Sequence, residues 1–180
     1  MVTRSVPLSR AAHPSKTGSR RLAAARLPQH TGRLYRAAYA LSGSATDAED
    51  LVQETFARVL SRPRRVRAGS EVAYLMRVLR NTWIDFARAR AARPEPAGGE
   101  AIDWVVEAES DPGGLALDVR LAYEGMRELP EHQREAIAAV DVLGLSYKEA
   151  ARSLRIRQGT LMSRLARARE RVASYMEGAE

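Results

Sequence analysis

Apolar residues recur along this chain at intervals of three and four, and this spacing constrains the fold more than any other feature. In residues 46–60, the positions with this spacing are Leu51, Val52, Thr55, Phe56, Val59 and Leu60. Such a stripe indicates a helix with one buried face. Every other long periodic segment has the same spacing, and strand patterns are scarce. The sequence therefore predicts an all-α protein.

Start and stop signals divide the chain into several helices. Residues 30–43 form one candidate, with Gly43 as its stop, and Thr46 and Glu49 have the spacing of a capping box for the next. A third helix is expected over residues 70–93. Two more are expected over 115–129 and 130–144, where Pro130 begins a helix and Gly144 ends it.

Residues 145–172 predict two helices joined by a tight turn. Ser146 and Glu149 again match a capping box, and the turn "RIR" places Ile156 as a buried plug. The second helix, from about Gln158, turns apolar residues inward and a polar, basic side outward. Two such helices describe a helix-turn-helix, whose second helix enters the DNA major groove. A helical hairpin without DNA function is the alternative.

Composition narrows the function classes. The 180 residues carry a net charge of +7, almost all from arginine, and contain no cysteine. Arginine suits a polyanionic partner, although GC-rich coding also favours it. Without cysteine, disulfides, thiolate metal sites and thiol catalysis are excluded. His13, His30 and His132 are scattered and no phosphate-binding glycine loop occurs, so we expect no enzyme, no metal and no cofactor.

The charges are segregated along the chain. Residues 1–26 hold six bases and no acid, residues 58–93 hold ten arginines against Glu71 and Asp85, and residues 94–118 hold seven acids and no base. We therefore expect four parts: a disordered basic arm over 1–26, a helical domain over 27–93, a flexible acidic linker over 94–114 and a second helical domain over 115–180. For the arm, contact with DNA or RNA and an unstructured extension without function are both open.

Two helix faces are candidate binding surfaces. The face opposite the 46–60 stripe carries Asp50, Gln53 and Glu54. It suits a protein partner, although spacing alone favours an ordinary solvated face. On the 70–93 helix, the side opposite the core stripe carries Arg77, Arg80, Asn81 and Arg88. These residues suit a nucleic-acid strand.

The motifs "AEDLVQETF", "RVLRNTWIDFARARAAR" and "LPEHQREAI…LGLSYKEAARSLRIRQGTLMSRLARARERV" together resemble the two conserved regions of extracytoplasmic-function (ECF) sigma factors, a group within the sigma-70 family. The resemblance covers about residues 30–93 and 115–175. It implies sigma region 2 for the first domain and sigma region 4 for the second. Its function would be to bind core RNA polymerase, direct it to promoters and open the DNA.

The resemblance also implies roles for particular residues. Asp50, Gln53 and Glu54 match the helix that docks on the clamp helices of the largest polymerase subunit, which favours the protein-partner interpretation. Arg77, Arg80, Asn81 and Arg88 match the region that melts and reads the minus-ten element, and the loop 61–69 matches one that captures a flipped-out base. Thr160, Ser163, Arg164 and Arg167 match positions that contact the minus-thirty-five element.

Relatives are commonly held by an anti-sigma factor, so we expect such a partner here. A regulator that binds duplex DNA without polymerase is the competing hypothesis. No apolar run approaches the roughly 18 residues that span a bilayer. We therefore expect a cytoplasmic protein with no membrane insertion.

Overall fold

The computed structural model describes residues 19–22, 24–92 and 115–179. The predicted acidic linker and the first 18 residues of the predicted arm lie outside these ranges. The described part is built from helices, apart from two strands of three residues each. This confirms the all-α prediction. Within these ranges, no helix is long and apolar enough to cross a membrane.

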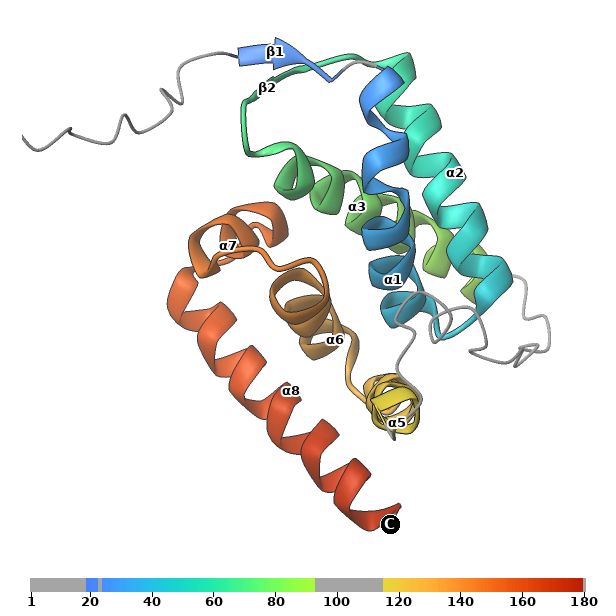
Figure 1. Cartoon of the computed structure of the whole chain (residues 1–180), viewed down its shortest axis with the longest axis vertical. Helices are drawn as coiled ribbons and strands as arrows, with labels where there is room; N and C mark the ends of the chain where they lie inside the picture. The colour runs from blue at the N-terminus through green and yellow to red at the C-terminus, as the bar shows by residue number, and fades with distance from the viewer. Residues whose placement is uncertain (1–18, 23, 93–114, 180) are drawn as a thin grey trace, which may run out of the picture.

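The first half contains helices α1 (Thr31–Ser42), α2 (Ala45–Ser61) and α3 (Glu71–Ala92), which pack together (Figure 1). Gly43 ends α1 in the left-handed conformation with φ 69°, as predicted. The start of α2 differs from the prediction. Ser44, and not Thr46, is the N-cap, because its hydroxyl accepts a hydrogen bond from the backbone N–H of Asp47.

The end of the predicted arm is ordered. Ser19–Arg21 form strand β1, which pairs antiparallel with β2 (Arg65–Arg67) in the loop between α2 and α3. Two short 3₁₀ turns, η1 (Ala24–Arg26) and η2 (Pro28–His30), then lead into α1. In this structure, backbone pairing with a distant loop and the two short turns hold the described residues of 19–26.

The second half contains α5 (Leu115–Arg127), α6 (Glu131–Ile137), a π-helical segment η3 (Ala138–Val142), α7 (Tyr147–Leu154) and α8 (Gln158–Gly178). Pro130 is the N-cap of α6 and Gly144 follows η3 with φ 66°. Ser146 and Glu149 form the predicted capping box at the start of α7. α7 and α8 form the expected helix-turn-helix, and Arg155 between them has φ 57°.

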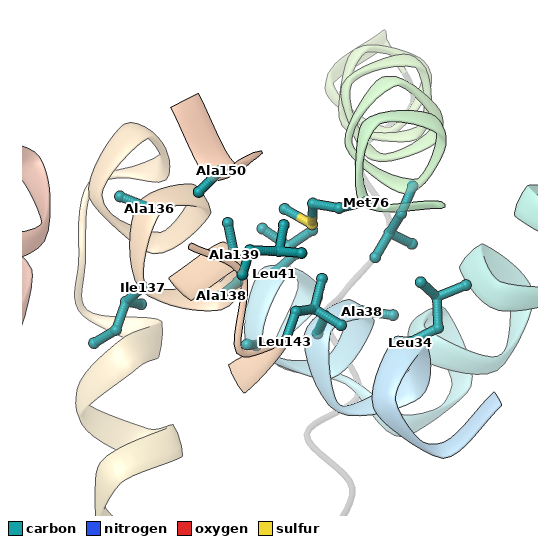
Figure 2. Close-up of a cluster of buried hydrophobic side chains, with 14 of the residues drawn as sticks. Leu34, Ala38, Leu41, Met76, Ala136, Ile137, Ala138, Ala139, Leu143 and Ala150 are labelled. Carbon is teal, nitrogen blue, oxygen red and sulfur yellow. The ribbon is translucent and has the colours of Figure 1, made fainter. Parts of the chain in front are cut away.

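One hydrophobic core runs through both halves. Figure 2 shows Leu34, Ala38 and Leu41 of α1 and Met76 of α3 gathered with apolar side chains of α6, η3 and α7. Leu41, Met76 and Leu143 have no exposed surface. The two halves therefore share buried apolar surface, which stabilises their association in this arrangement.

Two arginines tie the halves together across this core. The Arg33 guanidinium donates a hydrogen bond to the carbonyl of Leu143. Arg134 of α6 donates to the carbonyl of Leu41 near the end of α1 at 2.9 Å, and also to the carbonyls of Arg127 at the end of α5 at 3.2 Å and Leu129 beyond it at 2.9 Å. The sequence predicts two separate domains on a tether, whereas the described residues pack as one closed unit.

Candidate polymerase and nucleic-acid interfaces

The outer face of α2 carries the three residues that the sequence assigns to polymerase binding. Asp50, Gln53 and Glu54 are all exposed, while Leu51, Val52 and Thr55 of the same helix are buried. Glu54 accepts a hydrogen bond from Arg58 at 2.7 Å, and Arg58 also reaches Asp85 of α3 at 2.6 Å. Exposed ion pairs of this kind contribute little to stability. The face is therefore open to a partner.

The four residues assigned to minus-ten DNA do not form one open face. Arg77 lies near the start of α3 with its guanidinium 5.4 Å from the centre of the Tyr74 ring. Arg80, Asn81 and Arg88 follow along the helix, and of these only Arg88 is exposed. Arg80 and Arg88 line a cleft whose opposite wall is α6 and α8 of the second half.

An ion pair closes that cleft. Arg80 Nε lies 2.7 Å from Glu135 Oε1 of α6, and the Glu135 side chain is only 4% exposed. Burial raises the pKa of the Glu135 carboxyl above its ordinary value, and the neighbouring Arg80 opposes this effect. In this arrangement Arg80 of the first half is paired with a buried carboxylate of the second half.

The residues assigned to minus-thirty-five DNA lie together on α8. Thr160, Ser163 and Arg167 are exposed near its N-terminal half, and Ser163 donates a hydrogen bond to the Thr160 carbonyl at 3.0 Å. Arg164 is half-buried because it lines the same cleft as Arg80. The opposite side of α8 is buried through Leu161, Leu165, Ala168 and Val172, as predicted. The exposed residues can therefore enter a major groove without unfolding any helix.

A second cleft, of about 330 Å³, lies between the β2 loop, the start of α3 and α7. Five arginines from three elements line it: Arg64, Arg65, Arg67, Arg77 and Arg152. Glu149 is the one carboxylate among its lining residues. Such a surface attracts anions. The sequence indicates the basic loop, but the contribution of Arg152 from α7 depends on how the two halves pack.

Sequence reasoning missed Glu135 and Arg134, which hold the two halves together. Both lie in the helix predicted over residues 130–144, and no signal in the periodicity marks a buried carboxylate or guanidinium. Gln133, also buried, lies on the same helix. Two buried polar residues, Gln133 and Glu135, with half-buried Arg134 between them, indicate a contact between domains, and only the folded arrangement reveals it.

Comparisons with known proteins agree with this geometry. The Sigma-70 region 2 family model matches residues 28–93, and the Sigma-70 region 4 model matches residues 120–172. The region 2 match covers the unit of α1–α3, and the region 4 match covers most of the second half, including the helix-turn-helix. The chain belongs to the sigma-70 family.

Relatives narrow the class further. The chain is 36% identical over 151 residues to the ECF RNA polymerase sigma factor SigE of Mycolicibacterium smegmatis, a match that covers 82% of this chain and 59% of that protein. It is 37% identical over 147 residues to the ECF RNA polymerase sigma factor EcfG of Rhodopseudomonas palustris, which covers 79% of this chain and 80% of the relative. Within the sigma-70 family, it is an ECF sigma factor.

A solved structure has the same fold. The sigma factor RpoE of Bartonella quintana, in complex with the anti-sigma factor NepR, superposes with a TM-score of 0.71 at 28% identity, covering 85% of this chain and 95% of that one. Sigma factors initiate transcription and are not enzymes. The expectation that this chain is not an enzyme is therefore confirmed by its family.

Proposed function

We propose that this chain is an alternative sigma factor whose α2 face binds core RNA polymerase while α3 and α8 bind separate elements of a promoter. The observation that carries this proposal is the combination of an exposed acidic face on α2 with an exposed polar and basic face on the second helix of a helix-turn-helix. A protein that acts on DNA through polymerase needs both. The cytoplasm, where polymerase and DNA lie, is the expected location.

Each face has a distinct task in this mechanism. Asp50, Gln53 and Glu54 contact the clamp helices of the largest polymerase subunit. Thr160, Ser163, Arg164 and Arg167 bind the minus-thirty-five element as duplex, and Arg77, Arg80, Asn81 and Arg88 bind the minus-ten element as it melts. Because the acidic linker joins the two domains, binding of one raises the effective concentration of the other, so neither domain needs a high affinity alone.

The closed arrangement is the polymerase-free form in this proposal. Arg80 is paired with Glu135 and Arg164 lines the same cleft, so two of the assigned DNA contacts are covered. Binding to polymerase and promoter then requires the halves to separate. An anti-sigma factor is the expected partner that would hold the protein inactive, as NepR binds its sigma factor.

A direct test is duplex binding by Arg167→Ala. Arg167 is exposed on α8 and outside both clefts, so its loss removes a DNA contact without changing the fold. If it makes a bidentate base contact, binding of polymerase with this chain to promoter DNA should weaken by about 1–3 kcal/mol, roughly 5- to 150-fold. The matched control is Arg171→Ala, one turn further from the N-terminus of α8. Equal affinities for wild type and Arg167→Ala would contradict the assignment.

Membership of the ECF sigma factors argues against the competing hypothesis, a helix-turn-helix regulator that never joins polymerase. The two are separated by Asp50→Arg, which reverses the charge of the α2 face and leaves α8 untouched. The sigma factor should lose binding to core polymerase and keep its affinity for duplex DNA. A regulator would not bind core polymerase with or without the substitution, and its affinity for duplex DNA would also be the same in both proteins.

A further inference from the structure

The cleft of about 330 Å³ has positive charge on both of its walls. The β2 loop and the start of α3 form the wall that belongs to the first half, and α7 forms the wall that belongs to the second. Figure 1 shows α7 beside the start of α3, with the β2 loop above it. The volume of the cleft is within the range of small-molecule sites. One wall carries four arginines and the other carries one: Arg64, Arg65, Arg67 and Arg77, and opposite them Arg152.

Little in the described part of the chain neutralises this charge. Among the described residues, four of the lining arginines form no ion pair: Arg64, Arg67, Arg77 and Arg152. Glu149, the one carboxylate in the described lining, is held by the capping box of α7 and accepts a hydrogen bond from the backbone N–H of Ser146 at 3.1 Å. The cleft therefore keeps an excess of positive charge.

The closed arrangement itself creates this concentration of charge. Arg152 lies near the arginines of the first half because the two halves pack together, and like charges that are brought close repel one another. An anion between the walls would replace this repulsion with attraction on both sides. Because a ligand that binds one form of a protein favours that form, such an anion would stabilise the closed arrangement.

The chemistry of the lining indicates the kind of anion. Guanidinium groups bind phosphate oxygens through paired hydrogen bonds. Five arginines against one carboxylate leave an excess of four positive charges, which a single phosphate does not balance. Several phosphate groups in series carry a comparable negative charge in a small volume. A nucleic-acid strand fits the cleft less well, because loading onto promoter DNA, as proposed above, separates the two walls.

We propose that this cleft binds a small oligophosphate ion through arginines of both halves, and that the bound ion favours the closed arrangement. The ion is either inorganic or the phosphate chain of a nucleotide, and both present the same chemistry to the cleft. A bound ion covers Arg77, which is assigned to minus-ten DNA, and keeps α7 against the first half. The consequence for transcription rests on the proposed function: the ion opposes loading of the chain onto polymerase and promoter.

The site is tested by isothermal titration calorimetry of the full-length chain with sodium tripolyphosphate, in a buffer free of phosphate and sulfate. The wild-type chain should bind one ion. Arg64→Gln and Arg152→Gln each remove one positive charge, from opposite walls, and each should weaken binding at least about tenfold. The matched control is Arg171→Gln, which removes the same charge from an exposed position of α8 outside the cleft. This control should bind the ion as the wild type does.

The site is overturned if the wild-type chain shows no saturable binding, or if Arg171→Gln loses as much affinity as the cleft variants. It is also overturned if Arg64→Gln weakens binding and Arg152→Gln does not, because the ion would then bind the loop of the first half alone, as a nucleic-acid strand could. Adenosine triphosphate distinguishes the two sources. An affinity equal to or below that of tripolyphosphate supports an inorganic ion, and a higher affinity supports a nucleotide.

The effect on loading is measured as the affinity of the chain for core polymerase with and without saturating tripolyphosphate. Coupling between two ligands is reciprocal, so the ion should weaken polymerase binding about tenfold for the wild type and much less for Arg152→Gln. Equal weakening of both proteins would overturn the link to the closed arrangement, since the ion would then act on polymerase. If the wild-type chain never binds polymerase, the proposed function fails, while the titration still decides the ion site.

Discussion

At the scale of residues, Glu135 carries the contact between the two halves of the chain. It is almost fully buried, and its one described cationic neighbour at ion-pair distance is Arg80 from the other half. Burying a charged carboxylate is unfavourable, and its partner offsets part of that cost. Arg80 is also one of the residues proposed to bind DNA, so in that proposal the same guanidinium pairs with Glu135 in the closed form and with DNA in the open one.

Glu135 predicts a pH dependence of stability. Its pKa is raised in the folded chain, so the folded state binds the proton more tightly than the unfolded state. Stability from this group is therefore present at low pH and falls as pH rises from the ordinary carboxyl pKa through the raised one. Glu135→Gln lacks this titration. On lowering the pH from about 8 to about 5, wild type should gain melting temperature relative to Glu135→Gln; parallel curves for the two proteins would refute this.

At the scale of elements, the helices follow from the sequence and their contacts with one another do not. Periodicity and stop signals predict the helices that end at Gly43 and near Gly144, and the Ser146 capping box places α7 correctly. These features depend on residues a few positions apart. The Ser44 cap was missed because Thr46 and Glu49 match the same pattern two residues later.

Strands β1 and β2 show where such reasoning fails. A three-residue strand is too short to show alternation, and Ser19 pairs with a residue 48 positions away. The same limit applies to the candidate site. Helical spacing predicts which residues lie on the outer faces of α2 and α8. The contacts that cover Arg80 and Arg164 come from the opposite half of the chain and depend on tertiary packing.

The turn between α7 and α8 gives a prediction for local stability. Arg155 has φ 57°, a left-handed conformation that costs an L-residue about 1 kcal/mol. Glycine adopts it freely, so Arg155→Gly should stabilise the chain by roughly 0.5–1 kcal/mol in urea denaturation. Arg152→Gly, inside α7, is the matched control and should destabilise by about 1 kcal/mol. A loss of stability at residue 155 would show that its side chain contributes more than its backbone costs.

At the scale of the whole molecule, the closed arrangement joins the parts of the chain that match sigma-70 region 2 and region 4. It is held by the apolar surface around Leu41 and Leu143 and by the hydrogen bonds of Arg33 and Arg134. A sequence cannot reveal this interface, because small apolar residues such as Ala138 and Ala139 fit the core of one domain as well as a contact between two.

Separation of the halves can be followed by energy transfer between two dyes. The chain contains no cysteine, so Ala89→Cys on α3 and Ala173→Cys on α8, both exposed, give two unique labelling positions. Transfer should be high in the free protein and fall when core polymerase is added, since the two regions then separate. Transfer that stays the same on binding polymerase would contradict the opening step.

The central claim, that this chain directs polymerase through an acidic face and a helix-turn-helix, is tested most directly by run-off transcription with purified core polymerase and a pool of genomic fragments. We predict transcripts with discrete start sites for the wild-type chain. Asp50→Arg should abolish these transcripts while its binding to duplex DNA persists. Absence of specific transcripts with the wild-type chain, or equal transcription by Asp50→Arg, would contradict the account.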